Sequence, residues 1–116
     1  MLKLTRTFIV KNEKGWHARP CSRIVKLLKS YPKVTVFFEK LGCASLRASG
    51  DSIFELMKLG VNYGDKIAYT LQGNDKSQMY RLSQALVKLN ELLAKEESKD
   101  NHDFTILKNI KQQRDF

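Results

Sequence analysis

A histidine and an arginine stand two residues apart in "GWHARP", residues 15–20, directly ahead of a helical sequence pattern. The neutral imidazole of His17 has a nucleophilic ring nitrogen, and the guanidinium of Arg19 is a planar set of donors suited to phosphate. The first N–H groups of a helix have no intrahelical partner and lie at the positive end of its dipole, so they favour an anion. Together these groups predict a place where a phosphoryl group is transferred to His17.

The two residues that flank this pair suit a junction between a strand and a helix. Gly15 lets the incoming backbone turn sharply, and Pro20 is tolerated in the first turn because its missing N–H would lack a partner there anyway. The alternative interpretation is an exposed cap residue at His17 followed by a solvated arginine, which is the commoner meaning of a lone histidine. The combined Gly-x-His-Ala-Arg-Pro pattern at such a junction favours phosphoryl chemistry.

Apolar residues repeat along the chain either at every second position, as in strands, or at every third and fourth position, as in helices. These patterns predict the elements that hold this segment. The predicted strands cover residues 2–11, 34–39, about 43–48 and 66–72, and the predicted helices cover residues 17–30, about 53–60 and about 76–95. Strands with one apolar face need cover on that face, and three amphipathic helices can supply it. The sequence therefore predicts an α+β domain with helices on one side of a four-stranded antiparallel sheet, in the order β-α-β-β-α-β-α.

Apolar side chains at these spacings define the predicted core. The strands contribute Phe8 and Val10, then Val34, Val36 and Phe38, then Ile67, Tyr69 and Leu71; the helices contribute Cys21, Ile24, Val25 and Leu28, then Met79, Leu82, Leu86, Leu89 and Leu93. After Lys95 the chain becomes polar and charged. We therefore expect a domain of residues 1–96 and a basic C-terminal tail, residues 97–116, with some capacity for a helical turn.

Composition narrows the class of protein. The chain has 116 residues and a formal net charge of +9, which fits one small globular domain that attracts polyanions or acidic partners. The basic residues are spread out without a Lys/Arg block or a basic-aromatic pattern, so nucleic acid is not the expected partner. The sequence has no long apolar run and no signal-peptide core, which leads us to expect a cytoplasmic protein without membrane insertion.

Metal and disulfide chemistry are not expected. The two cysteines, Cys21 and Cys43, do not form a CxxC pair, and in a reducing compartment they are more often bystander thiols than a bridge. With only two histidines, His17 and His102, the chain offers no zinc-ligand pattern. We therefore expect no cofactor.

Two motifs together resemble a known family. They are "GWHARP" at residues 15–20 and "DSIFELMKLGVNYGDKI" at residues 51–67. Over about residues 4–95 the sequence resembles HPr, the histidine-containing phosphocarrier of the bacterial phosphoenolpyruvate-dependent sugar phosphotransferase system. The resemblance implies an open-faced β-sandwich and a carrier rather than an enzyme. It also implies that Enzyme I phosphorylates Nδ1 of His17 and that the group then passes to a histidine on an IIA component.

The opening segment supplies the groups that such a carrier needs. Arg19 should compensate the charge of the phosphoryl group as it moves between histidines. The backbone N–H groups of Ala18 and Arg19 are further candidate phosphate donors. The protein would contribute positioning and charge stabilisation rather than further covalent chemistry.

The second motif carries a candidate regulatory site. In many HPr proteins a serine at the start of the short helix is phosphorylated by an HPr kinase/phosphorylase, and that position is Ser52 here. A phosphate would add about −1.5 to −2 charge beside the expected docking surface. Asp51 stands where many members have lysine, which weakens the expectation that a kinase recognises the site. The alternative interpretation of Ser52 is a plain helix cap, and the two are compatible.

An apolar docking patch is expected on the short helix. The resemblance implies that Ile53, Phe54 and Met57 contact Enzyme I and IIA, whereas the alternative is simple core packing. Docking is favoured for Phe54 and Met57, and the two interpretations are even for Ile53. Trp16 stands where the family usually has a smaller apolar residue, and it is expected in the same patch or as a shield for the imidazole.

Three classes of function follow. A phosphoryl carrier is favoured, and we expect it to be a monomer. The alternative is a regulatory module of the same fold that signals phosphorylation state without feeding sugar uptake, and a basic nucleic-acid-binding domain is the third. The intact segment 15–20 favours the carrier because a purely regulatory protein could dispense with His17. A longer hairpin at residues 38–49 has no assigned role.

Overall fold

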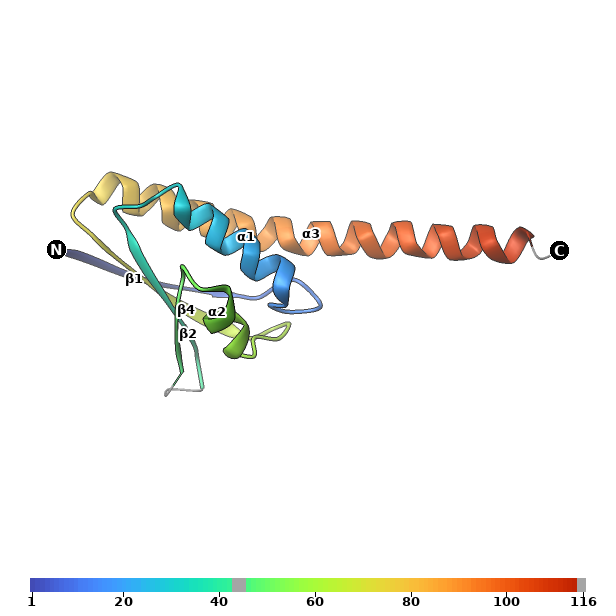
Figure 1. Ribbon diagram of the computed structural model, residues 1–116, viewed down its shortest axis with the longest axis horizontal. Helices are drawn as coiled ribbons and strands as arrows, with labels where there is room; N and C mark the ends of the chain where they lie inside the picture. The colour runs from blue at the N-terminus through green and yellow to red at the C-terminus, as the bar shows by residue number, and fades with distance from the viewer. Residues whose placement is uncertain (43–45, 115–116) are drawn as a thin grey trace.

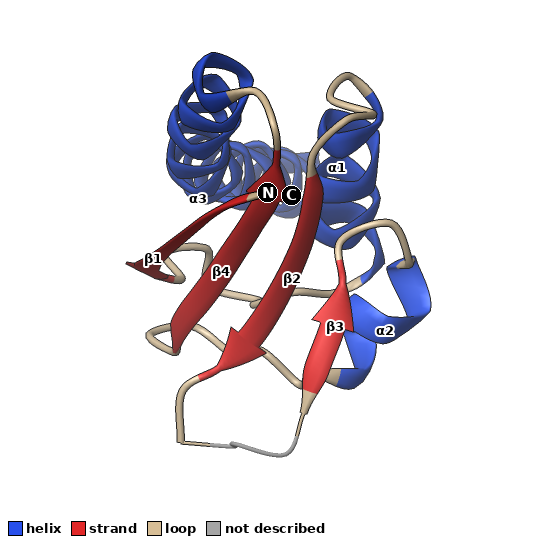
Figure 2. Ribbon diagram, turned by 90° about the vertical axis from the view of Figure 1, so that its left-hand side faces the viewer, coloured by secondary structure: helices blue, strands red, loops and turns tan. Residues whose placement is uncertain are grey.

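The protein folds in the predicted order of elements. The computed structural model describes the backbone of residues 1–42 and 46–114 and the side chains of residues 1–42 and 46–97. Its elements are β1 (Leu2–Ile9), α1 (Ala18–Lys29), β2 (Thr35–Lys40), β3 (Arg47–Ser49), α2 (Ile53–Lys58), β4 (Lys66–Gly73) and α3 (Lys76–Arg114). The strands form one antiparallel sheet in the order β1-β4-β2-β3. Three helices cover one face of it (Figure 1 and Figure 2), so the predicted fold is confirmed.

The inward face of the sheet is apolar because every second residue of a strand points the same way. β4 lies between β1 and β2, and its Ile67, Tyr69 and Leu71 are at most 1% exposed. The register pairs Val36 with Leu71 and Phe38 with Tyr69 across β2 and β4. These pairs confirm the predicted alternation and place the apolar side chains of the strands under the helices.

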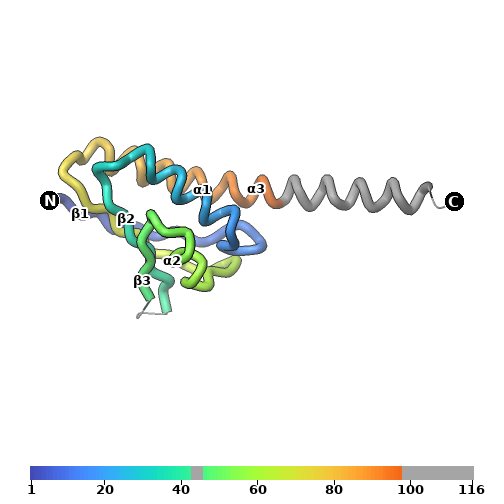
Figure 3. Tube along the Cα trace, in the orientation of Figure 1, coloured from blue at the N-terminus to red at the C-terminus, as the bar shows by residue number. Residues whose placement is uncertain are grey.

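The helices α1 and α3 close the core over the sheet. α1 buries Cys21, Ile24, Val25 and Leu28, and α3 buries Met79, Leu82, Leu86, Leu89 and Leu93. Both stripes match the predicted helical spacing, and α1 contacts both α2 and α3. The tube in Figure 3 shows the blue loop before α1 and the orange part of α3 at the same end of the domain. Segments far apart in the sequence therefore meet at the N-terminus of α1.

The last helix differs from the sequence prediction. α3 continues to Arg114 as one helix, whereas the sequence pattern ended it near residue 95. No glycine or proline interrupts residues 76–114, so the segment contains neither of the two strongest helix breakers. In the described part of the chain, no helix is both long and apolar enough to cross a membrane.

The expectation of a basic tail at residues 97–116 is wrong on composition. That segment contains Lys99, Lys108, Lys111 and Arg114 against Glu97, Asp100, Asp103 and Asp115. Its formal charge is therefore balanced, and the excess positive charge of the chain lies in residues 1–96. In the predicted longer hairpin, β3 begins at Arg47, and residues 43–45, including Cys43, lie outside the described residues.

Candidate active site

The backbone at Gly15 brings the chain tightly into α1. Gly15 has a positive φ of 67°, and a Cβ there would lie 2.2 Å from the carbonyl oxygen of Val61. Trp16 N–H donates to that same oxygen at 3.0 Å. Only glycine fits this close approach, because any side chain would displace the backbone after α2. The turn delivers His17 to the start of the helix.

His17 is the N-cap residue of α1, as predicted, but its side chain does not cap the helix. Its backbone is extended, with φ −86° and ψ −169°, and its carbonyl accepts the N–H of Cys21 at 3.2 Å. The imidazole makes no cap hydrogen bond. The imidazole therefore lies at the positive end of α1 without capping it, and the ring is available for other contacts.

The imidazole of His17 instead contacts a carboxylate on α3. Its Nε2 lies 3.0 Å from Oε1 of Glu97, 80 residues further along the chain. Glu97 also accepts the backbone N–H of Lys14 at 3.1 Å and the side-chain amide of Asn12 at 3.2 Å. Among the residues with described side chains, Nδ1 of His17 has no hydrogen-bond partner.

The charge state of Glu97 follows from its surroundings. Burial raises the pKa of the carboxyl, since its side chain is only 12% exposed. Hydrogen bonds from His17, the Lys14 backbone and Asn12 act in the opposite direction and leave the pKa below its ordinary value. Glu97 is therefore ionised near neutral pH.

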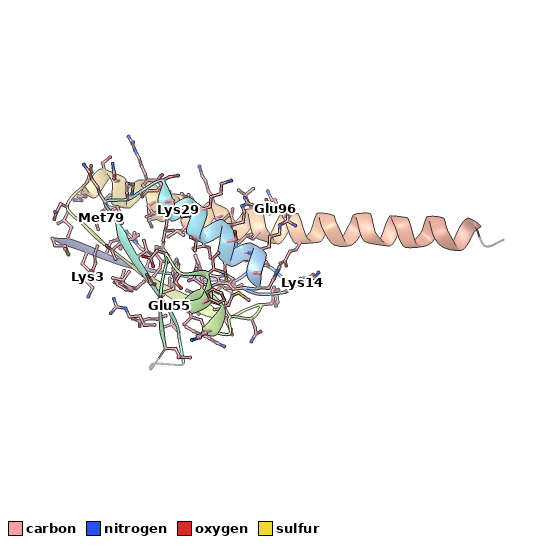
Figure 4. The ribbon with its side chains drawn as sticks, viewed as in Figure 1. Lys3, Lys14, Lys29, Glu55, Met79 and Glu96 are labelled. Atoms are coloured by element: carbon pink, nitrogen blue, oxygen red, sulfur yellow. The ribbon has the colours of Figure 1, made fainter. Side chains whose placement is uncertain are left out.

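Two arginines of α1 face the neighbouring glutamate. One amino group of Arg23 lies 2.7 Å from both carboxylate oxygens of Glu96. Arg19, which is more exposed, lies 3.8 Å from the same carboxylate. Figure 4 shows Lys14 and Glu96 at the same end of the domain, where the loop before α1 meets α3.

The contacts enclose a small mixed-charge cavity of about 110 Å³. It is lined by Lys14, His17, Arg19, Pro20, Leu93, Glu96 and Glu97. The predicted pair of His17 and Arg19 thus share one cavity, and the backbone N–H groups of Ala18 and Arg19 belong to the first turn of α1. A phosphoryl group on the histidine would meet a guanidinium and a helix N-terminus here.

Trp16 differs from the sequence expectation. Its indole is 5% exposed and packs edge-on to Phe8 and Phe38, with ring centroids 6.2 Å and 5.4 Å apart. The side chain belongs to the core because the residue before the cap turns inward under α1. This burial contradicts the expectation that Trp16 belongs to the exposed docking patch, whereas a shielding role beside the imidazole stays a prediction.

The short helix α2 carries the other predicted residues. Ser52 is its N-cap residue, and Oγ accepts the N–H of Glu55 at 3.2 Å. Phe54 is 80% exposed and Met57 42% exposed, while Ile53 is half-buried and packs on the core. The structure thus separates Ile53 from the two exposed apolar side chains. Asp51, beside the cap, is hydrogen-bonded to Ser49.

Sequence reasoning missed the two glutamates of the site. Glu96 and Glu97 follow Leu93 by three and four residues, so they lie on the same helix face as the buried stripe. Charged residues at core-facing spacing were the available signal. The identity of their partners could not be read from spacing, because α1 lies about 80 residues earlier.

Two other kinds of reactive group carry no chemistry here. Burial raises the pKa of the Cys21 thiol to about 11, and Sγ lies 3.6 Å from the carbonyl of Trp16. The thiol is therefore protonated and is not a nucleophile. Among the residues that the structure describes, no group of three or more His, Cys, Asp or Glu side chains could hold a metal ion.

Known proteins match this chain in both sequence and structure. A sequence model of the family described as "PTS HPr component phosphorylation site" matches residues 4–95. The multiphosphoryl transfer protein of Salmonella typhimurium is 36% identical over 76 residues, which is 65% of this chain. The chain spans only 20% of the length of that relative.

Solved structures give the same picture. HPr-C-His from Thermoanaerobacter tengcongensis aligns with a TM-score of 0.66 at 27% identity, covering 78% of this chain and 94% of that chain. A phosphocarrier protein HPr from Bacillus anthracis aligns with a TM-score of 0.58 at 25% identity, covering 69% and 92% of the two chains. Fold and site segment therefore agree with the same family.

Proposed function

The chain belongs to the HPr family, and we propose that it accepts a phosphoryl group from phospho-Enzyme I on Nδ1 of His17. It then passes the group to a histidine of an IIA component of a sugar phosphotransferase system. The observation that carries the proposal is the N-cap of α1, where the imidazole makes no cap hydrogen bond. The N-cap residue is therefore a candidate nucleophile, and it lies at the positive end of the helix beside Arg19.

Transfer needs no proton to move. The Nδ1–phosphorus bond forms while the donor's bond to phosphorus breaks, and the electron pair of the broken bond stays with the donor. The imidazole of His17 gains positive character, and the phosphoryl oxygens bring negative charge to the first turn of α1. Arg19 and the backbone N–H groups of Ala18 and Arg19 are the donors that balance this charge. The reverse process delivers the group to the next acceptor.

Partner docking is proposed on α2. Phe54 and Met57 are large apolar side chains left exposed on a helix that packs against α1. Exposed apolar side chains of this kind are typical contacts of a protein interface. Ile53 takes part at most through its exposed portion, and Trp16 is excluded because its indole is buried. The net charge of +9 suits acidic partner surfaces.

Regulation through Ser52 is a second part of the proposal. Ser52 stands at the start of the helix that bears Phe54 and Met57, so a phosphate there would lie in the surface that a donor must cover. Desolvation of a dianion and repulsion from an acidic partner would then weaken docking. Asp51 already places one negative charge beside the acceptor, which argues against strong kinase recognition.

Intact mass spectrometry tests the carrier function. The full chain is incubated with phosphoenolpyruvate and Enzyme I, and we expect one acid-labile, base-stable phosphoryl group. Adding a purified IIA component should then remove the group from this chain and label the IIA component. A chain that takes up no phosphate from active Enzyme I would contradict the carrier function and would favour the regulatory alternative.

A further inference from the structure

We propose that Glu97 is a positioning residue for His17, holding the Nε2–H so that Nδ1 is the acceptor nitrogen and balancing the charge that the ring gains on phosphorylation. The inference rests on the proposed phosphoryl transfer to His17. It also goes beyond the family match, because that match ends at residue 95 and Glu97 lies past it.

The carboxylate of Glu97 is held in place before any phosphoryl group arrives. It is bonded to the Asn12 side chain and the Lys14 backbone, both in the loop that leads into α1. The side chain is 12% exposed, compared with 42% for the imidazole that it contacts. A group with several fixed partners and little exposure loses little freedom when it orients another side chain.

The hydrogen bond fixes which ring nitrogen is the nucleophile. An ionised carboxylate can only accept a hydrogen bond, so at 3.0 Å the Nε2 of His17 must be the donor. In a neutral imidazole the other nitrogen, Nδ1, then carries the lone pair. Among the described side chains, none makes a hydrogen bond to Nδ1. The contact with Glu97 thus leaves the lone pair of Nδ1 without a hydrogen-bond partner from this part of the chain.

The same contact balances charge during transfer. When the Nδ1–phosphorus bond forms, the ring keeps its Nε2 proton and becomes formally cationic. Glu97 faces this cation from Nε2, on the side of the ring away from the new bond. A nearby carboxylate stabilises that state more than it stabilises the neutral imidazole, so it lowers the barrier to transfer.

Glu96 has a different role and makes a useful contrast. Its carboxylate is bound to Arg23 at 2.7 Å and lies 3.8 Å from Arg19, and no hydrogen bond or ion pair between the described side chains joins it to His17. Glu96 therefore organises the arginines, whereas Glu97 organises the histidine. The two adjacent glutamates therefore contact different groups of the site, Glu96 the arginines and Glu97 the histidine.

A merely structural role is the competing explanation. The bonds from Asn12 and Lys14 also fasten α3 to the loop, so Glu97 could simply stabilise the domain. That role would change the unfolding temperature without changing the protonated ring nitrogen of His17. A spectroscopic measurement on the ring therefore separates the two.

The test compares Glu97→Gln and Glu97→Ala with the control Glu91→Gln in the full chain. Glu91 lies on the same helix, and its ion pair is with exposed Lys11, at 3.6 Å. Nitrogen-15 NMR of the imidazole reports which nitrogen carries the proton, and quench-flow labelling from phosphoenolpyruvate and Enzyme I reports the rate. For Glu97→Ala we expect a larger Nδ1–H fraction. For both Glu97 variants we expect transfer slowed by about tenfold, as for loss of a charged hydrogen bond.

Rescue by the conservative variant sharpens the result. Glutamine keeps an acceptor oxygen but not the charge, so Glu97→Gln should retain more of the parent's Nε2–H tautomer than Glu97→Ala. The control Glu91→Gln should match the parent in both measurements. A folded Glu97→Ala protein with the parent's tautomer, or with the parent's rate, would overturn the inference.

Failure of the inference is distinguishable from failure of the proposed function. If the parent takes up phosphate on His17 and the Glu97 variants do so equally fast, the carrier function stands and the inference is wrong. If the parent takes up no phosphate at all, the carrier function is wrong, and the inference, which depends on it, falls with it.

Discussion

The N-termini of α1 and α2 differ in what the cap side chain does. At α2, Ser52 Oγ accepts the N–H of Glu55 at 3.2 Å, so the helix satisfies one of its unpaired donors itself. At α1, His17 makes no cap bond, and its Nε2 lies 3.0 Å from Glu97. The side chain of Ser52 stabilises its own helix, whereas the side chain of His17 bonds to a different helix. The same helix position can therefore place a side chain for local capping or for a long-range contact, depending on the residue type.

The largest expected effect is the loss of phosphorylation when the N-cap residue of α1 is replaced. His17→Ala should abolish phosphorylation by phosphoenolpyruvate and Enzyme I, because no other described side chain in the cavity offers an imidazole. Intact mass measures the uptake, and Ser52→Ala serves as the matched control because it removes the other cap side chain and should still be labelled. Phosphate that persists in His17→Ala, or that appears on His102, would show that the acceptor is assigned wrongly.

Arg19 gives the second largest effect. Arg19→Ala removes the guanidinium that shares the cavity with His17 and keeps the helix, since alanine is the best helix former. We expect transfer to slow by roughly tenfold or more, in line with about 1.5–3 kcal/mol for a charged hydrogen bond. Stopped-flow or quench-flow labelling measures it, with Lys26→Ala, another exposed cation of α1, as control. Equal transfer rates in the two variants would show that Arg19 does not take part in the transfer.

The α2 cap is tested by two opposite substitutions. Ser52→Ala should lower the free energy of unfolding by about 1 kcal/mol through loss of the cap, and it should leave the transfer rate near the parent's. Ser52→Asp keeps an acceptor and adds charge, so it should preserve stability and slow labelling severalfold. Added salt should relieve part of that slowing, because screening weakens exposed charge interactions.

The control for Ser52→Asp is the same charge placed elsewhere. Ser77→Asp adds a carboxylate to the exposed first turn of α3, and Figure 4 shows Met79 of that turn at the opposite end of the domain from Glu96. It should not slow labelling. If Ser52→Asp and Ser77→Asp behave alike, the effect comes from net charge and Ser52 is only a helix cap.

The smallest expected effect is the pH dependence of the α1–α3 contact. The pKa of Glu97 is lower in the folded chain than its ordinary value of 4.5. Its contribution to stability is therefore complete above that value and is lost as the pH falls through the lowered pKa, where the folded carboxyl takes up its proton. Denaturant unfolding of the parent and Glu97→Gln should converge in stability as the pH falls below 4.5. A constant difference across that range would mean that the carboxylate contributes no charge-dependent stability.

The sequence predicted the elements and the placement of His17 and Arg19 at the start of α1 because both depend on local patterns. Alternation identified the buried face of β4, and three- and four-residue spacing identified the stripes of α1 and α3. Gly15 predicted the sharp entry into α1, and the positive φ of 67° explains why glycine is required there. These features are set within a few residues by backbone sterics and side-chain periodicity.

The burial of Trp16 and the end of α3 were not predicted, for related reasons. Trp16 stands in a turn between two elements, where no period says which way a side chain points, and the surrounding rings of Phe8 and Phe38 decide it. The helix α3 passes residue 95 without a glycine or proline to end it, so a change in polarity alone did not mark its end. The periodic spacing of apolar residues specifies neither the direction of the Trp16 side chain nor the end of α3.

By itself, the sequence determined the order of elements, the sheet-facing residues and the placement of His17 and Arg19 at the start of a helix. The tertiary structure alone decided that Glu97 meets His17 and that Glu96 meets Arg23, 80 and 73 residues away. The physical reason is that hydrophobic periodicity fixes which face of a helix is buried, but not what lies opposite its ends. That depends on how α3 lies across α1 on the sheet, which only the packed core sets.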